Sequence, residues 1–386
     1  MNFVAKTFLG LEEVLLQELV ALGAQNIQKE RRAVTFSGDL ALMYRANLCL
    51  RTASRVLKII DVFDVADADE MYEKTKKIDW ENYMSENQTF AVDATIYSET
   101  FRHSQFVSYR VKDAVADYFN EKINRRPSVR LTSPDVTINV HISHNCCTIS
   151  LDSSGESLHK RGYRVASTLA PINEALAAGI LLMTGWNGQM NFIDPMCGSG
   201  TFLIEAGLIA LNIPPGIFRK QFAFENWIDF DRELFDEIYN DDSKERDFKF
   251  KIFGYDLSPK AVQIAQDNVK AAGLSKYVEL EKKNIADFET PKGAAMMITN
   301  PPYGERIKHD DLMELYSQIG RTLKHKCMGI NSWVISSNID CMHNIGLRPA
   351  QKIKLMNGDL DCELWKFNIF AGKRNDYLAM KSRRRN

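Results

Sequence analysis

The pattern of apolar and polar positions divides the chain into three stretches with different orders of strands and helices. In the first 65 residues, extended segments at 3–8, 33–38 and 55–65 alternate with apolar residues at helical spacing in 11–22 and 40–50. Apolar residues three and four positions apart form one face of a helix, whereas alternation with period two is typical of a strand. The first stretch, residues 1–65, is therefore predicted to be a small α+β unit.

The second stretch runs from residue 66 to 165 and is predicted to be another α+β unit. TFAVDATI (89–96) alternates as a strand does, and residues 104–123 have the spacing of a long amphipathic helix. VTINVHIS (136–143) and CCTISLD (146–152) follow as two strands. The short polar connection between them, His144-Asn145, predicts a hairpin.

From about residue 171 the pattern changes to helices that alternate with short, apolar strands. The predicted helices are 171–186, 201–211 and 259–273, and the predicted strands are 190–195, 249–256, 276–284 and 294–300. This alternation is typical of a doubly wound, Rossmann-like parallel sheet with helices on both faces, in which ligands bind at the carboxyl ends of the strands. Residues 166–386 are therefore predicted to form an α/β domain of this class.

Composition changes this prediction little. The chain of 386 residues is 45% hydrophobic and 26% charged, with a formal net charge of -1. No apolar run approaches the roughly 20 residues that span a bilayer, and the first residues lack the layout of a secretory signal. The seven cysteines contain no CxxC pair and are expected to be reduced, with no metal site. These observations predict a cytoplasmic protein.

The segment DPMCGSGT, residues 194–201, lies between a predicted strand and a predicted helix. Gly198 and Gly200 allow a tight turn and a close approach of the backbone to a ligand, and the helix that follows presents N–H groups. A phosphate-binding P-loop would need a Lys here and a dinucleotide fold a third glycine, but Thr201 and Leu203 occupy the relevant positions. Asp194 at the strand end suits a cofactor with a cationic amino group.

Two further strand ends carry polar residues that suit a nucleoside. Asp256 ends the strand FGYD, where its carboxylate can accept hydrogen bonds from both ribose hydroxyls, although it also fits the start of a helix. At the end of the next strand, Asn284 or Asp287 could meet an adenine amino group. Asp256 lies much further from the glycines than the roughly 20 residues of a simple dinucleotide fold. The excess, about 212–248, is predicted to be an inserted lid or flank.

The segment NPPY, residues 300–303, follows the last of these strands. An exocyclic amine of a nucleobase is a weak nucleophile because its lone pair is delocalised into the ring. The Asn300 amide oxygen and the Pro301 carbonyl would accept its hydrogens and direct the lone pair at a methyl donor, while the prolines stiffen the turn. The Tyr303 ring offers a flat face on which a base can stack, a contact worth about 1–3 kcal/mol. The segment therefore predicts recognition of a base amine.

The segments DPMCGSGT, FGYD and NPPY, in this order on a doubly wound sheet, resemble the motifs of class I S-adenosylmethionine-dependent methyltransferases that act on exocyclic amines. The resemblance covers about residues 171–370 and implies S-adenosylmethionine as cofactor, without a metal. It implies that Glu174, in the segment PINE, lies near the methionine portion. The catalytic residues that it implies are Asn300, Pro301, Pro302 and Tyr303. The implied cofactor-binding residues are Glu174, Asp194, Pro195, Cys197, Gly198, Ser199, Gly200, Asp256, Leu257, Asn284, Ile285 and Asn300.

The first two stretches extend the resemblance to bacterial RNA methyltransferases with a THUMP domain. A ferredoxin-like unit, a THUMP-like RNA-binding unit and a catalytic domain follow one another in the 23S rRNA guanine-N2 methyltransferases, which are often labelled N6-adenine-specific DNA methylases. The implied partner is RNA, either 23S rRNA or a ribosome-assembly intermediate. Basic clusters occur at 121–130, 159–164 and 381–386. The candidate RNA contacts in the first two are Arg125, Arg126, Arg130, His159, Lys160, Arg161 and Arg164.

Several alternatives remain at this point. The segment NPPY does not distinguish guanine N2 from adenine N6 or cytosine N4, and only the family resemblance favours 23S rRNA over tRNA. A hypothesis of a different class is a non-catalytic RNA-binding assembly factor that retains an idle methyltransferase fold. Binding of S-adenosylmethionine would distinguish an enzyme from such a factor.

Overall fold

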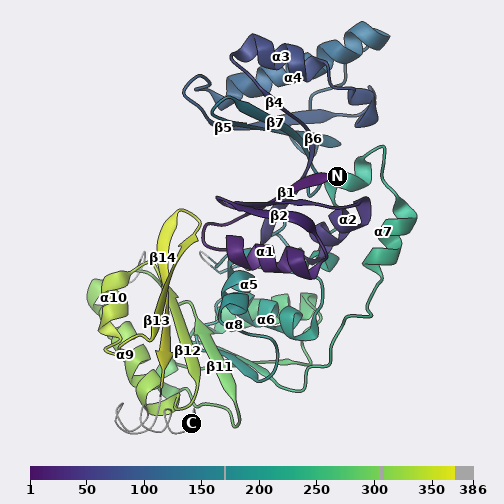
Figure 1. The fold of residues 1–386 in the computed structure, drawn as a ribbon. Coiled ribbons are helices and arrows are strands. Elements are labelled where there is room, and N and C mark those ends of the chain that lie inside the picture. The colour runs from purple at the N-terminus through teal and green to yellow at the C-terminus, as the bar shows by residue number, and fades with distance from the viewer. Residues whose placement is uncertain (169–170, 305–307, 370–386) are drawn as a thin grey trace, which may run out of the picture. The chain divides into compact units, whose positions relative to one another are not determined.

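The computed structural model describes residues 1–168, 171–304 and 308–369 and divides the chain into two compact units. The N-terminal unit comprises Met1–Lys160 together with Pro214–Asp241, and the catalytic unit comprises Arg161–Ile213 together with Asp242–Asn386. Figure 1 shows the elements of both units along the chain. The sequence predicted three units, at 1–65, 66–165 and 166–386. The structure instead groups residues 214–241 with the N-terminal residues, so its two units do not coincide with those ranges. The predicted boundaries near residues 65 and 165 stay predictions.

A seven-stranded sheet organises the described part of the N-terminal unit, in the order β2-β3-β1-β4-β7-β6-β5. Its strands are β1 (Asn2–Thr7), β2 (Gln25–Glu30), β3 (Ala33–Ser37), β4 (Ala53–Asp64), β5 (Phe90–Tyr97), β6 (Val136–Ser143) and β7 (Cys146–Asp152). The long strand β4 pairs with β1 through Phe3↔Lys58 and with β7 through Leu57↔Asp152. One strand therefore joins the ferredoxin-like part and the THUMP part in a single sheet.

The helices of this unit are α1 (Glu12–Ala21), α2 (Leu40–Cys49), α3 (Ala68–Lys76), α4 (Ser104–Ile123) and α7 (Arg232–Tyr239), with short 3-10 helices η1 (Trp80–Asn82), η2 (Pro215–Phe218) and η3 (Ala223–Asn226). The predicted helix 104–123 and the hairpin at His144-Asn145 are confirmed. The structure adds β2 and α3, which the sequence did not predict. Strand β2 lies at the sheet edge with almost every residue exposed, so it has no apolar alternation to detect.

The inserted segment Pro214–Asp241 completes the core of the N-terminal unit. Its Phe222, Phe224 and Phe235 side chains are buried in the same cluster as residues of β1, β3 and α2. The Tyr44 ring of α2 lies 4.5 Å from the Phe224 ring, between centroids, and the Tyr44 hydroxyl accepts the Asp231 N–H at 2.9 Å. The segment was predicted to be a lid or flank, and its middle part is instead a structural component of the other unit.

A second seven-stranded sheet organises the described part of the catalytic unit, in the order β10-β9-β8-β11-β12-β14-β13. Its strands are β8 (Asn191–Asp194), β9 (Ile252–Asp256), β10 (Val278–Lys282), β11 (Ala295–Thr299), β12 (Asn331–Ser336), β13 (Gln351–Asn357) and β14 (Leu360–Asn368). The pairs among β8 to β12 are parallel, and β14 runs antiparallel to both of its neighbours. The predicted doubly wound α/β fold is thereby confirmed.

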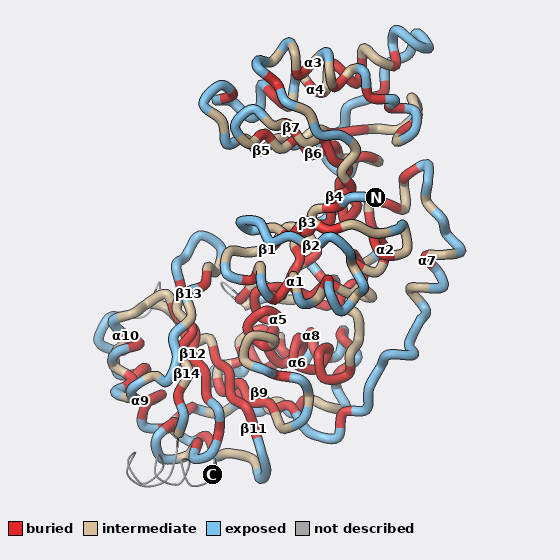
Figure 2. Tube along the Cα trace, in the orientation of Figure 1, coloured by how far each residue is buried: buried red, intermediate tan, exposed pale blue. Residues whose placement is uncertain are grey.

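Helices cover both faces of this sheet. They are α5 (Glu174–Met183), α6 (Thr201–Leu211), α8 (Pro259–Ala271), α9 (His309–Lys326) and α10 (Ile339–Asn344), with η4 (Ile285–Asp287) after β10. Helices α5, α6 and α8 lie on one side of the strands and α9 and α10 on the other (Figure 1). Strands β9, β11 and β12 are largely buried between these layers (Figure 2). Among the described residues, no helix is long and apolar enough to cross a membrane.

Candidate active site

The glycine loop follows β8 and leads into α6. Gly198 and Gly200 have φ of 53° and 80°, a region that favours glycine. The Cys197 N–H donates to the Tyr255 carbonyl of β9 at 2.8 Å, and the Gly198 N–H donates to Asp256 Oδ2 at 3.0 Å. Burial raises the pKa of the Cys197 thiol well above its ordinary value, which keeps it protonated and suits packing rather than nucleophilic chemistry.

Asp194, the last residue of β8, is 2% exposed. Burial raises the pKa of its carboxyl to about 7, although hydrogen bonds from the Met196 N–H and the Thr299 hydroxyl favour the charged form. A cation bound nearby would lower this pKa again, because an opposite charge favours the ionised carboxylate. The environment of Asp194 therefore fits a ligand with positive charge.

The ends of β9 and β10 present the residues that were predicted to meet a nucleoside. Asp256 accepts N–H groups from Gly198 and Ser258, which orients its carboxylate at the sheet edge. Leu257, the next residue, is 63% exposed, so its side chain is accessible to a planar ligand. Asn284 caps η4 by accepting the Ala286 N–H at 2.9 Å, and Asp287 is exposed on the same turn. The geometry does not choose between Asn284 and Asp287.

The first residues of the catalytic unit bind the helix that follows the glycine loop. Arg161 is 2% exposed and faces Glu205 of α6 at 3.4 Å, where the Tyr163 hydroxyl also donates at 2.9 Å. Arg161 is thus buried inside the unit, so its role as an RNA contact, predicted from the basic cluster, does not fit its position.

Arg164 lies beside the predicted methionine site. Its Nε donates to Glu174 Oε1 at 2.7 Å and its Nη2 donates to Thr201 Oγ1, in the first residue of α6, at 2.9 Å. Among the described residues, its buried Nη1 has no hydrogen-bond partner. A buried guanidinium nitrogen without an acceptor is costly, so this position suits a carboxylate ligand better than an RNA backbone outside.

The segment NPPY follows β11, which lies next to β8 in the sheet. Pro301 is buried, whereas Asn300 and Tyr303 are half-buried. The Tyr303 hydroxyl donates to Asn300 Oδ1 at 2.5 Å, which holds the amide in place and leaves the second lone pair of that oxygen for an amine. The adjacent Thr299 hydroxyl donates to Asp194 Oδ1 at 2.9 Å, so this segment and the glycine loop are directly linked.

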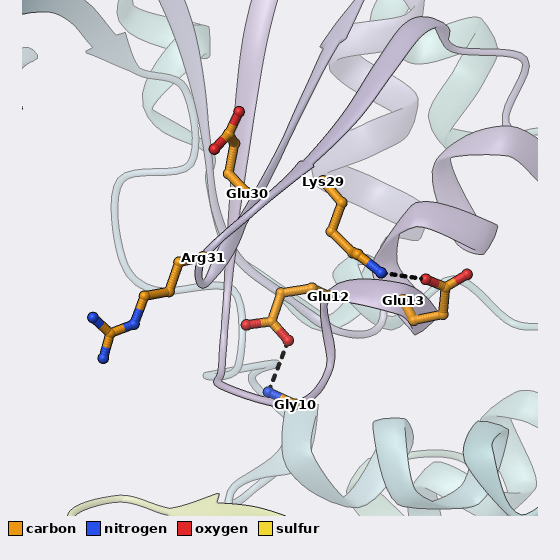
Figure 3. Close-up of a pocket in the computed structure, with 6 residues that line it drawn as sticks. All are labelled: Gly10, Glu12, Glu13, Lys29, Glu30 and Arg31. Atoms are coloured by element: carbon orange, nitrogen blue, oxygen red, sulfur yellow. Dashed lines mark hydrogen bonds and ion pairs between the residues drawn. The ribbon is translucent and has the colours of Figure 1, made fainter.

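A separate hollow on the N-terminal unit is lined by Gly10, Glu12, Glu13, Lys29, Glu30 and Arg31 (Figure 3). Lys29 pairs with Glu13 at 2.8 Å, and Glu12 accepts the Gly10 N–H at 2.8 Å. Lys29 and Glu13 neutralise one another, Glu12 binds a main-chain N–H, and the six lining residues offer no aromatic face for a base. The candidate site therefore remains at the carboxyl ends of β8, β9, β10 and β11.

Comparison with known protein families agrees with this geometry. Residues 161–366 match the family described as RMKL-like, methyltransferase domain, residues 65–152 match the THUMP domain, and residues 2–57 match the RlmL ferredoxin-like domain. The first match covers more than half of the chain. The chain belongs to the RMKL-like methyltransferase family.

Similar proteins support this membership. A Synechocystis protein provisionally named RNA methyltransferase slr0064 is 40% identical over 94% of this chain and 95% of its own length. The ribosomal RNA large subunit methyltransferase K/L of Syntrophotalea carbinolica is 38% identical over 95% of this chain, which spans 53% of that relative. The crystal structure of SMU.472, provisionally named a methyltransferase and solved with SAH, is 32% identical, with a TM-score of 0.86 over 96% of this chain and 99% of that one. This RMKL-like methyltransferase therefore uses S-adenosylmethionine as its cofactor.

The remaining candidate RNA contacts of this RMKL-like methyltransferase lie in its N-terminal unit. Arg125 and Arg130 are exposed, and Arg126 forms an ion pair with Asp117 of α4. Lys160 pairs with Glu156 at 2.7 Å, and the His159 ring lies 2.8 Å from the Ser157 hydroxyl, between Nδ1 and Oγ. The third basic cluster, 381–386, lies outside the described residues.

Proposed function

We propose that this RMKL-like methyltransferase transfers a methyl group to the N2 amine of a guanine in 23S rRNA. The observation that carries the amine chemistry is the segment NPPY, which directly follows Thr299, whose hydroxyl donates to Asp194 at the start of the glycine loop. The choice of guanine N2 and of 23S rRNA rests on the resemblance to 23S rRNA guanine-N2 methyltransferases and on relatives named ribosomal RNA large subunit methyltransferase K/L. Bound S-adenosylmethionine supplies a methyl group already activated on a sulfonium. The residues of the chain hold the base amine in line with that methyl group, so that its nitrogen approaches the methyl carbon from the correct direction.

Each site residue has a proposed role in this reaction. Asn300 Oδ1 and the Pro301 carbonyl accept the two amine hydrogens, which favours a lone pair directed away from the base ring. Tyr303 stacks on the unstacked base, and Pro302 limits the turn to one conformation. The proposed cofactor-binding residues are Glu174, Asp194, Pro195, Cys197, Gly198, Ser199, Gly200, Asp256, Leu257, Asn284, Ile285 and Asn300.

We also assign Arg164 to the cofactor rather than to RNA. Its guanidinium already neutralises Glu174, and the buried Nη1 without a described partner suits the carboxylate of the methionine portion. The proposed RNA contacts are then Arg125, Arg126, Arg130, His159 and Lys160.

The base and the RNA are tested together. Ribosomal RNA from a strain that lacks this gene should accept labelled methyl from the purified protein, and nucleoside digestion should yield N2-methylguanosine. Label in N6-methyladenosine, or label confined to tRNA or DNA, would contradict the assignment of substrate and leave the amine chemistry intact. Absence of S-adenosylmethionine binding by calorimetry would favour the non-catalytic assembly factor.

The role of the N-terminal unit is tested with a shortened chain. Removal of residues 1–160 alone would expose Phe222, Phe224 and Phe235, so Pro214–Asp241 must be replaced by a short linker. The ends to be joined are close, because Asn212 Nδ2 donates to the Lys244 carbonyl at 2.8 Å. This chain is expected to bind S-adenosylmethionine and to lose activity on folded rRNA. Equal activity of the shortened and full chains would show that the N-terminal unit is not needed to bind the rRNA.

A further inference from the structure

Side chains from outside the segment NPPY hold two of its carbonyl groups. The Tyr316 hydroxyl of α9 donates to the Pro302 carbonyl at 3.2 Å. Asn338, which caps α10 through the Cys341 N–H, donates from Nδ2 to the Tyr303 carbonyl at 3.2 Å. The orientation of two consecutive peptide groups is thereby determined by two helices that contribute nothing to the motif itself.

The hydroxyl of Tyr316 is itself part of a chain of hydrogen bonds. It lies 2.7 Å from Ser336 Oγ at the end of β12, and Ser336 Oγ accepts the Asn338 N–H at 3.0 Å. A carbonyl has no proton to give, so Tyr316 donates to Pro302 and must accept from Ser336. The chain therefore runs from the Asn338 N–H through the Ser336 and Tyr316 hydroxyls to the Pro302 carbonyl. Tyr316 and Ser336 are both 0% exposed, so water does not compete for the bond between their hydroxyls at the centre of this chain.

This arrangement selects which acceptors of the segment remain for substrate. The Pro302 and Tyr303 carbonyls are occupied, whereas no described residue donates to the Pro301 carbonyl. Rotation of the Pro302–Tyr303 peptide would also move the Tyr303 ring and, through its hydroxyl, the Asn300 amide. The chain of buried hydroxyls is thus linked to the stacking ring and, through the Tyr303 hydroxyl, to the Asn300 amide.

We propose that Tyr316, Ser336 and Asn338 are positioning residues for methyl transfer, acting by holding the peptide groups behind the amine acceptors. This inference rests on the proposed function of the segment NPPY. It differs from an ordinary role in core packing because it concerns the rate of methyl transfer more than the binding of S-adenosylmethionine, whose proposed contacts lie mostly in the glycine loop and at the ends of β9 and β10.

The test removes single hydroxyls and leaves the packing nearly unchanged. Tyr316→Phe and Ser336→Ala are compared alone and together in the full chain, with rRNA from a strain lacking this gene as the methyl acceptor. Tyr44→Phe is the matched control, because Tyr44 is also 0% exposed and its hydroxyl makes a main-chain hydrogen bond in the N-terminal unit. For each variant, kcat for methyl transfer, S-adenosylmethionine affinity by calorimetry and the thermal midpoint are measured.

Tyr316→Phe and Ser336→Ala are each expected to lower kcat about tenfold, the effect of losing one hydrogen bond to a held group, with S-adenosylmethionine affinity within about twofold of wild type. The double variant should be no slower than the slower single variant, because both changes break one chain. Tyr44→Phe should lower the thermal midpoint comparably and leave kcat unchanged. Unchanged kcat in the two single variants, or an equal loss of kcat in Tyr44→Phe, would overturn the positioning role. Methyl transfer by the wild type would still support the proposed function in that case. If the wild-type protein methylates no RNA amine, both the positioning role and the proposed function are wrong.

Discussion

The glycine loop and the segment NPPY follow neighbouring strands of one sheet, yet different kinds of contact hold them. The glycine loop depends mainly on its own backbone: Gly198 and Gly200 adopt conformations that other residues rarely reach, Cys197 donates to the Tyr255 carbonyl, and the Asp256 carboxylate accepts the Gly198 N–H. The segment NPPY is held by two prolines and by side chains from α9, β12 and α10. Both segments come together through the Thr299–Asp194 hydrogen bond.

This difference indicates how the two segments divide the work of the enzyme. A loop that depends on its backbone offers N–H groups and space, which suits tight binding of a cofactor. A turn that depends on side chains presents acceptors whose exact direction can be adjusted, which suits a reacting amine. Changes in the loop should therefore alter cofactor affinity or stability, and changes in the turn should alter the rate.

The largest expected effect is on the rate, from Asn300→Ala. The substitution removes the acceptor proposed to act mainly in the transition state, so methyl transfer should fall by about 10²–10³-fold, while S-adenosylmethionine affinity stays near normal because the other proposed cofactor contacts remain. Single-turnover transfer to rRNA and calorimetry measure the two quantities. A fully active variant would mean that the amine is held elsewhere. A matching loss of S-adenosylmethionine affinity would mean that the NPPY turn, like the glycine loop, serves cofactor binding.

The next effect is on affinity, from Asp256→Ala. Loss of a carboxylate that can accept both ribose hydroxyls should weaken S-adenosylmethionine binding about 100-fold, with kcat recovered at saturating cofactor. Asp256→Asn is the matched control, since its amide oxygen can still accept the Ser258 N–H that Oδ1 now binds. If Asp256→Ala binds S-adenosylmethionine with normal affinity, the carboxylate serves only to hold the local turn.

Gly200→Ala tests the dependence of the loop on its backbone. A methyl group there would lie 3.2 Å from the Ala265 Cβ, in a residue with φ of 80°. Strain and crowding together should cost about 1–3 kcal/mol of unfolding free energy. Gly273→Ala is the control, because its φ is 70° and a methyl group would meet nothing within 4 Å. Denaturant unfolding should show the larger loss for Gly200→Ala, and equal losses would mean that crowding at Ala265 is unimportant.

The smallest effect is a pH-dependent gain in stability from Asp194→Asn, measured without cofactor. Burial raises the folded-state pKa of this carboxyl from 3.8 to about 7, so its ionisation opposes folding increasingly as the pH rises between these values. Asn retains an oxygen for the Thr299 hydroxyl without the charge, so its stability relative to the wild type should be greater at pH 8 than at pH 5. A gain that is equal at both pH values would contradict the raised pKa.

Sequence patterns predicted the parts of the fold whose periodicity is strong. The helix at 104–123, the hairpin at His144-Asn145, the strands that end in Asp194 and Asp256 and the strand that ends just before Asn300 all lie as expected. The candidate site was predictable because its residues follow buried strands in short, recognisable segments. Their contacts along the sheet edge then follow from the parallel topology.

Features that depend on distant partners were not predictable. Arg161 looked like a surface cation because its neighbours in sequence are basic, and only the fold reveals Glu205 beside it. Tyr316, Ser336 and Asn338 belong to no recognised motif, since ordinary polar residues at the ends of helices and strands have many structural uses. The aromatic residues of 222–235 were visible in the sequence, but nothing local indicated which unit they complete.

The inserted segment also has a consequence for the order of synthesis and folding. Domains at the start of a chain usually fold first as the ribosome extends them. Here the N-terminal core lacks Phe222, Phe224 and Phe235 until Arg161–Ile213, a part of the catalytic unit, has already been translated. Neither unit can then be finished before the other has begun, so the nascent chain must keep two partly formed cores apart while both are completed.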